Sequence, residues 1–146
     1  MEYVLQTHEL TKAYVGKPVV NRVNMNVKKG DIYGFIGRNG AGKTTLIRMV
    51  AGLAKPTNGS IQLFESNRLV EKRAQIGTMI ESPSLYPNMS ARENLEYYRI
   101  LYGIPSKTRV DEVLKIVSLE DAGKKKARHF SLGMRQRLGV AIALLS

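Results

Sequence analysis

Residues 37–44 of this 146-residue chain read Gly-Arg-Asn-Gly-Ala-Gly-Lys-Thr, and this stretch decides the fold. It has the spacing GxxxxGK(S/T), it follows an apolar run at residues 32–36, and a segment of helical character comes after it. Glycines let successive backbone N–H groups curl around a polyanion, and the following helix points its unpaired amides at the same charge. The stretch therefore predicts a phosphate-binding loop between a strand and a helix, and hence a nucleotide site.

Two side chains at the end of this loop have the chemistry that a bound nucleotide requires. Lys43 supplies a point charge to the terminal phosphates, and Thr44 offers a hydroxyl to Mg²⁺, which takes oxygen ligands and shares its shell with phosphate and water. An ordinary glycine-rich turn before a helix is the alternative. The loop residues predicted to bind the nucleotide are Gly37, Asn39, Gly40, Ala41, Gly42, Lys43, Thr44 and Thr45.

Composition limits the class of protein. A hydrophobic content of 43% and a charged content of 24% are typical of a soluble globular domain and argue against disorder. No stretch approaches the roughly 20 apolar residues that span a bilayer, and the first residues have no secretion signal. The absence of cysteine excludes disulfide and thiolate chemistry and agrees with a cytoplasmic setting.

The formal net charge of +11 would ordinarily suggest a nucleic acid or an anionic membrane as partner. The basic residues are scattered, however, apart from Lys124, Lys125, Lys126 and Arg128. That run is either a solvated loop or a contact with an acidic partner or lipid surface. We expect no nucleic acid partner.

Sequence patterns predict a strand-rich first half and a helical second half. Ser90 and Glu93 form a capping box at the start of one helix, Ser131 caps the last one, and Gly52 ends the helix after the loop. The sequence thus predicts an α/β fold divided into residues 1–86 and 87–146. Strands are expected at residues 4–7, 23–27, 32–36, 61–64 and 76–80, and helices at 44–52, 90–103, 107–117 and 131–145.

Residues 130–137 read Phe-Ser-Leu-Gly-Met-Arg-Gln-Arg. They resemble the signature of ATP-binding cassette (ABC) ATPases, Leu-Ser-Gly-Gly-Gln followed by a basic residue, Gln and Arg. The resemblance implies a P-loop NTPase (RecA-like) core with an antiparallel β subdomain and an α-helical subdomain, truncated before the Walker B strand. It also implies ATP and Mg²⁺ as cofactors. Tyr14 stands where the family has an aromatic residue that stacks on adenine, although it could simply pack on the small sheet.

The family's signature contacts the γ-phosphate held by the other subunit of a head-to-tail dimer. Ser131 and Gly133 match it, whereas Leu132 and Met134 replace a Gly and a Gln. A Ser N-cap places a hydroxyl and free amides at a helix start, which suits an anion. A plain capped helix is the alternative.

Glu81 departs from the family, which usually has Gln at this position. There the side chain reaches Mg²⁺ and the attacking water, so the resemblance implies Lys43 and Glu81 as catalytic residues and Thr44 and Glu81 as metal ligands. A Glu resembles the subgroup that exports, or confers immunity to, bacitracin and lantibiotic-type peptides. A solvent-facing Glu at a strand end is the alternative.

The resemblance also implies partners and a location. Tyr86, Asn88 and Arg92 lie where relatives pack against a membrane-spanning permease subunit, although core packing would also explain Tyr86. We expect a homodimer of ATPase subunits on the inner face of the cell membrane, facing the cytoplasm, that couples ATP hydrolysis to export of a peptide antibiotic. The alternatives are an ABC ATPase that acts on ribosomes or nucleic acid, and a kinase or GTPase, which would leave the signature unexplained.

In relatives, the signature helix is followed by a strand that ends in Asp-Glu and then by a switch His. Ser146 lies before the position of this strand. General-base catalysis is worth roughly 10²- to 10⁴-fold in rate. We therefore expect the chain by itself to bind Mg-nucleotide weakly, to hydrolyse it negligibly and to have unpaired sheet edges that favour association.

Overall fold

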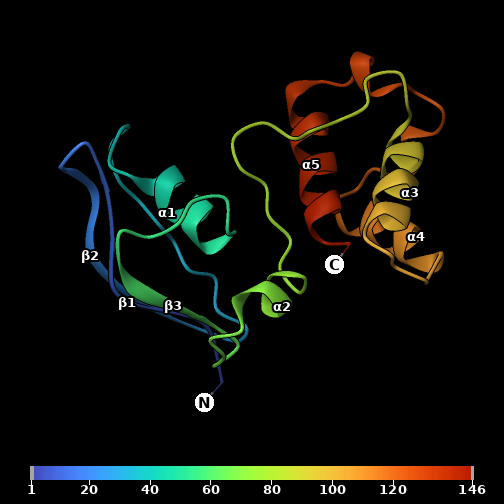
Figure 1. Ribbon diagram of the computed structural model, residues 1–146. Coiled ribbons are helices and arrows are strands. Elements are labelled where there is room, and N and C mark those ends of the chain that lie inside the picture. Colours follow the sequence, from blue (N-terminus) through green and yellow to red (C-terminus); the bar gives the residue numbers. More distant parts are fainter. Residues whose placement is uncertain (1, 146) are drawn as a thin grey trace. The chain divides into compact units, whose positions relative to one another are not determined.

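The computed structural model describes residues 2–145, and contacts divide the chain into two compact units, Met1–Gln75 and Ile76–Ser146 (Figure 1). Each unit has a hydrophobic core of its own. The elements in chain order are β1 (Tyr3–Tyr14), β2 (Lys17–Lys28), α1 (Lys43–Val50), β3 (Asn58–Leu63), α2 (Leu69–Arg73), α3 (Ala91–Leu101), α4 (Thr108–Ile116) and α5 (Leu132–Ala143), with 3-10 helices at Glu120–Ala122 and Ala127–His129.

The first unit is built on an antiparallel sheet with the strand order β2-β1-β3. A tight turn at Val15 and Gly16, both with positive φ, joins β1 to β2. Such backbone angles match the twist of the flanking strands, so the hairpin closes without splaying. Thr7 lies opposite Met25 on one side and Ile61 on the other, which places β1 in the centre of the sheet.

Helix α1 packs its apolar side into the first unit, where Leu46 and Met49 are buried. It begins after Gly42 and ends before Gly52, whose φ of +83° is the left-handed conformation that commonly ends helices. The buried apolar residues of the unit are Leu10, Val20, Met25, Leu46, Met49, Ile61 and Leu63.

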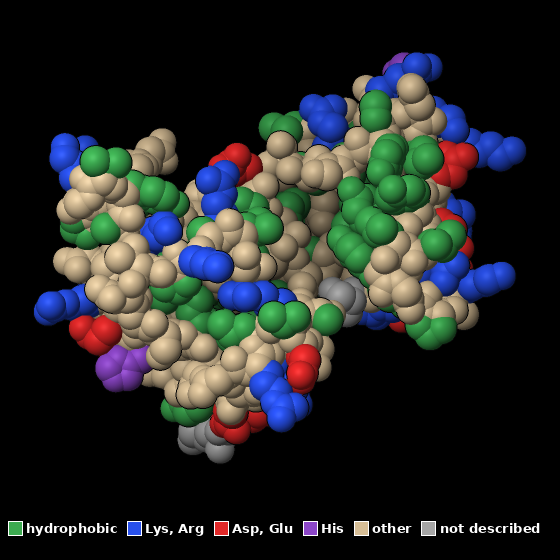
Figure 2. Space-filling view, viewed as in Figure 1, with side chains coloured by type: hydrophobic (Ala, Val, Ile, Leu, Met, Phe, Trp, Pro, Cys, Tyr) green, Lys and Arg blue, Asp and Glu red, His purple; other side chains and the backbone are tan. Residues whose placement is uncertain are grey.

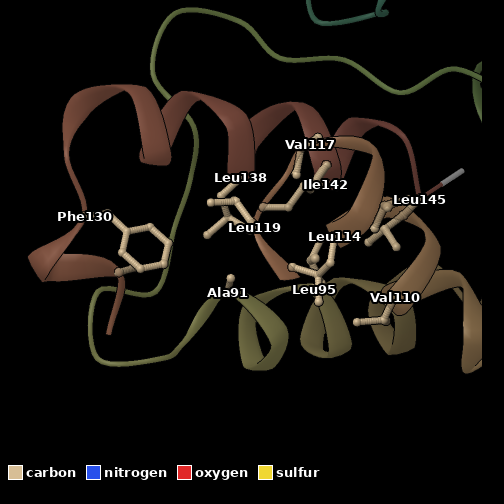
Figure 3. Close-up of a cluster of buried hydrophobic side chains, with 13 residues drawn as sticks. Ala91, Leu95, Val110, Leu114, Val117, Leu119, Phe130, Leu138, Ile142 and Leu145 are labelled. Carbon is tan, nitrogen blue, oxygen red and sulfur yellow. The ribbon is translucent and has the colours of Figure 1, made fainter. Parts of the chain in front are cut away.

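The second unit is a small helical bundle with one continuous core. Helices α3, α4 and α5 each contribute an apolar side to it, and Figure 3 shows Leu95, Leu114 and Leu138 directed toward one another from these three helices. Phe130, just before α5, closes one end of the cluster. Three helices of 9 to 12 residues are short for independent stability, so this shared core is what holds them.

Most of the predicted elements are confirmed. The strands expected at residues 4–7 and 23–27 lie within β1 and β2, the strand expected at residues 61–64 overlaps β3 up to Leu63, and the four expected helices correspond to α1, α3, α4 and α5. Both predicted caps are present: Ser90 and Glu93 form the complete capping box of α3, and Ser131 accepts a hydrogen bond from the Met134 amide. Helix α2 was not predicted, because five residues are too few to show a helical period.

The strand expected at residues 32–36 is absent, and this prediction is wrong. Ile32 and Ile36 are almost fully exposed, and the segment has no regular structure. An apolar run forms a strand only when neighbouring strands accept its backbone hydrogen bonds and cover its side chains. No strand among residues 2–145 pairs with this segment.

The strand expected at residues 76–80 is also absent, for a different reason. This segment lies against α5, where two glycines allow its close approach. A Cβ at Gly77 would lie 1.6 Å from the Ala143 carbonyl oxygen, and a Cβ at Gly139 would lie 2.5 Å from the Met79 sulfur. Met79 therefore lies against a helix and not beside a neighbouring strand, and the local sequence does not specify such a partner.

No helix among the described residues is long and apolar enough to cross a membrane. The expected division of the domain into parts at residues 1–86 and 87–146 stays a prediction.

Candidate functional site

The predicted phosphate loop borders a hollow of about 420 Å³ in the first unit. Residues 39–42 of the loop, the first turn of α1 and one residue of β2 surround it. The lining residues are Val19, Asn39, Gly40, Ala41, Gly42, Lys43, Thr44 and Thr45. Seven of the eight loop residues singled out from the sequence are thus brought together around one concave surface.

Glycine is required at two positions of the loop for its conformation. Gly40 and Gly42 have φ values of +82° and +87°, in the left-handed region that side chains disfavour. Gly42 is also packed closely, because a Cβ there would lie 2.3 Å from the carbonyl oxygen of Val19. The loop therefore turns back at these glycines and rests on the backbone of β2.

Helix α1 begins at the hollow in a form suited to an anion. Its N-cap is Gly42, no side chain caps it, and its first turn contains no acidic residue. The first amides of a helix lack intrahelical partners and carry the positive end of the helix dipole. A phosphate group in the hollow would meet these amides.

The Lys43 side chain folds back onto its own loop and is hydrogen-bonded to the loop backbone. Its Nζ donates hydrogen bonds to the carbonyl oxygens of Gly37, at 2.5 Å, and Arg38, at 2.8 Å. This explains the place of Gly37, which lies outside the hollow but anchors the lysine. The ammonium is held beside the loop, where a terminal phosphate could exchange for a carbonyl as its partner.

Tyr14 ends β1 and is about half exposed, at 51%. The Lys12 ammonium lies 5.0 Å from the centre of its ring and donates to the Lys55 carbonyl. Across the hairpin Tyr14 pairs with Lys17, two residues before Val19 of the hollow. The exposed ring surface could take a planar base.

Ser131 and Gly133 lie at the start of α5 in the second unit, and both are exposed. The Ser131 Oγ accepts from the Met134 amide at 3.2 Å, which leaves its hydroxyl proton free to donate. A Cβ at Gly133 would meet no described atom within 4 Å. The beginning of α5 is therefore open to a ligand.

The arginines of the signature have structural partners. Arg135 donates to the Phe130 carbonyl, and Arg137 donates to the carbonyls of Val117 and Ser118 at the end of α4. A guanidinium at the last carbonyls of a helix is favourable. These contacts fasten α5 to the rest of its unit, so that the segment before it is held in place.

Glu81 lies in the second unit, exposed, with a φ of +64°. A residue with a Cβ pays roughly 1 to 2 kcal/mol for the left-handed conformation. Among residues 2–145 no group of three or more His, Asp or Glu side chains could hold a metal ion.

Tyr86, Asn88 and Arg92 are held at the edge of the helical unit. The Tyr86 ring packs edge-on against Tyr97, with ring centres 4.5 Å apart, and the neighbouring Tyr97 hydroxyl and partial burial raise the pKa of Tyr86 to about 12. Asn88 accepts from Arg128, and Arg92 pairs with Asp111 of α4. Hydrophobic side chains gather on the surface over α3 (Figure 2). The large hydrophobic residues of this helix and its C-cap that are exposed are Tyr97, Ile100, Leu101 and Tyr102.

Sequence reasoning missed Asn94, which is fully buried in α3. Its side chain accepts from the Tyr86 amide at 2.8 Å and donates to the carbonyls of Tyr86 and Ser90. The only signal in the sequence is a polar residue beside Leu95 on the apolar side of a helix. Asn94 fixes the loop that carries Tyr86.

A protein-family model described as ABC transporter matches residues 20–146. The bacitracin transport ATP-binding protein BcrA of Bacillus licheniformis is 51% identical over 99% of this chain and 48% of its own length. The lantibiotic transport ATP-binding protein SrtF of Streptococcus pyogenes is 40% identical over 98% of this chain and 62% of its own length. The chain thus spans about half the length of the curated relatives it matches.

Solved structures agree with the fold. The structure of cbiO1 from Clostridium perfringens, described as part of the ABC transporter complex cbiONQ, has a TM-score of 0.87 and 27% identity, and it covers 99% of this chain and 62% of that one. A putative ABC transporter ATP-binding protein from Pyrococcus furiosus has a TM-score of 0.82 and 30% identity, over 97% of this chain and 70% of that one. The α/β class with an antiparallel sheet and a helical part is confirmed.

Proposed function

The chain belongs to the ABC transporter family, and from this premise we propose that it is the ATP-binding part of a membrane exporter, coupling ATP binding and hydrolysis to movement of a peptide antibiotic or similar substrate. The observation that carries the proposal is the hollow formed by the phosphate loop and the uncapped start of α1.

The loop would bind the phosphates of ATP through its backbone. Oxygens of the phosphate chain would accept from the amides between Gly40 and Thr45, and Lys43 would exchange its loop carbonyls for the terminal phosphates. Thr44 lies in the first turn of α1, so its hydroxyl would be a ligand for Mg²⁺. A bound Mg²⁺ supplies positive charge that neutralises the phosphates.

Tyr14 would bind the adenine by stacking on its exposed face. Base stacking on an aromatic residue contributes about 1 to 3 kcal/mol. Because every base has a π face, this contact gives affinity without strong selection of the base.

Ser131 and Gly133 would contact the γ-phosphate of an ATP bound to a second copy of the subunit. The exposed start of α5 supports this role, because its hydroxyl and amides remain accessible. Glu81 would orient water and contribute an oxygen ligand near the metal, with a charge that the usual Gln lacks. Lys43 and Glu81 are the proposed catalytic residues.

The proposed partners are a membrane-spanning permease and a second ATPase subunit, at the cytoplasmic face of the membrane. The exposed aromatic residues of α3 and the loop carrying Tyr86 support a protein contact in the second unit. The relatives named for bacitracin and lantibiotic transport support a peptide antibiotic as the exported class.

The proposed activity belongs to the whole protein.

Equilibrium binding of labelled ATP to the chain, with and without Mg²⁺, tests the proposal. We expect saturable binding that Lys43→Met weakens at least about tenfold, because a charge-assisted contact is lost. Lys28→Met is the matched control, since Lys28 ends β2 and is exposed. Equal binding by wild type and Lys43→Met would contradict the proposal.

A further inference from the structure

Arg73 ends α2 and lies against the far end of the phosphate-binding helix α1. Its Nε donates to the Val50 carbonyl at 2.9 Å, and its NH2 group donates to the Met49 carbonyl at 3.0 Å. The guanidinium also covers Gly52, where a Cβ would lie 2.8 Å from it. One side chain therefore binds two of the last carbonyls of α1 and covers the glycine that ends the helix.

This contact matters because α1 is short. An isolated helix of 8 residues is not stable in water, so its geometry depends on tertiary contacts. Leu46 and Met49 anchor its apolar side in the core. Arg73 adds a contact that joins the end of α1 to α2.

The charge of Arg73 has the correct sign for its position. The last carbonyls of a helix carry partial negative charge, and a guanidinium matches two of them with its planar arrangement of donors. The opposite end of α1 begins the hollow that would hold phosphate. Cation and anion would thus stabilise α1 from its two ends.

We propose that Arg73 is a positioning residue for nucleotide binding, which fixes α1 so that its first amides point into the phosphate hollow. The part of this inference that concerns nucleotide binding rests on the proposed function. Arg73 does not touch the ligand in this assignment; it acts through the helix.

The test measures two quantities on the full chain: MgATP affinity and amide hydrogen exchange of α1. Arg73→Ala should weaken MgATP binding about fivefold and speed exchange in residues 43–50, and Arg73→Lys should restore part of both. Arg68→Ala is the matched control, because Arg68 precedes α2, the helix that Arg73 ends, and its side chain forms an exposed ion pair with Glu71 at 3.8 Å. Arg73→Ala affinity equal to that of Arg68→Ala would overturn the proposal.

A double-mutant cycle separates positioning from general loosening. Gly52→Ala should displace the guanidinium and also strain the backbone at a φ of +83°, so its loss of MgATP affinity should be smaller in the Arg73→Ala background than in the wild type. Additive losses would overturn the proposal, and if Arg73→Ala does not fold, Arg73→Lys takes its place in the cycle. A wild-type chain that does not bind MgATP would overturn the proposed function. In that case faster exchange of α1 in Arg73→Ala would still support the link between Arg73 and α1, and unchanged exchange would overturn it.

Discussion

Gly42 rests on Val19: a Cβ atom at Gly42 would lie 2.3 Å from the Val19 carbonyl oxygen. The phosphate loop is therefore supported by β2, an edge strand of the sheet, and α1 starts from that support. The position of the first amides of α1 therefore depends on having glycine at residue 42.

Gly42→Ala should abolish measurable ATP binding, because the new Cβ would push the loop off β2 and would also be strained at a φ of +87°. Gly30→Ala is the matched control. Gly30 has nearly the same φ, +86°, but a Cβ there would meet no described atom within 4 Å. Titration calorimetry should show ATP binding in Gly30→Ala and none in Gly42→Ala, and retained affinity in Gly42→Ala would contradict the described packing.

Tyr14→Ala should weaken ATP binding by about 5- to 150-fold, because a stacked base contributes about 1 to 3 kcal/mol. Tyr14→Phe keeps the ring and should bind ATP nearly as the wild type does. Fluorescence titration with an adenine nucleotide compares the variants. If Tyr14→Ala binds like Tyr14→Phe, the tyrosine only packs on the sheet.

Features set by neighbouring residues could be predicted from the sequence, and features set by distant residues could not. The phosphate loop and the capped helices could be predicted, because glycine conformations and helix caps are set by neighbours in the chain. The segments at residues 32–36 and 76–80 could not, because a strand needs a distant partner to complete it. The roles of Arg73 and Asn94 were invisible for the same reason: their hydrogen bonds join residues 8 to 24 positions apart.

Asn94→Leu should lower the free energy of unfolding of the chain by about 2 to 4 kcal/mol, because the partly buried Tyr86 amide would lose its hydrogen-bond partner and the Tyr86 carbonyl would lose one of its donors. Asn88→Leu is the control, since Asn88 is exposed and its side chain accepts a hydrogen bond from Arg128. Urea unfolding followed by circular dichroism measures both. Equal stability of the two variants would contradict the role of Asn94.

The capping box of α3 should make stability depend on pH in the acid range. The Ser90 amide first, and then Lys126, lower the pKa of Glu93 from its ordinary 4.5 to about 2. A lowered pKa in the folded state stabilises the protein above about pH 4.5, and that contribution is lost as the pH falls toward about 2. Unfolding free energies measured across this range should fall less steeply in Glu93→Gln, and an identical slope in both proteins would contradict the cap.

Amide chemical shifts of the labelled chain during titration with a non-hydrolysed MgATP analogue test the central claim most directly. The account predicts that the largest shifts fall on the amides of residues 40–45, around the hollow that Gly42 and α1 form. Saturable binding that leaves these amides unmoved and shifts another surface of the chain would contradict it.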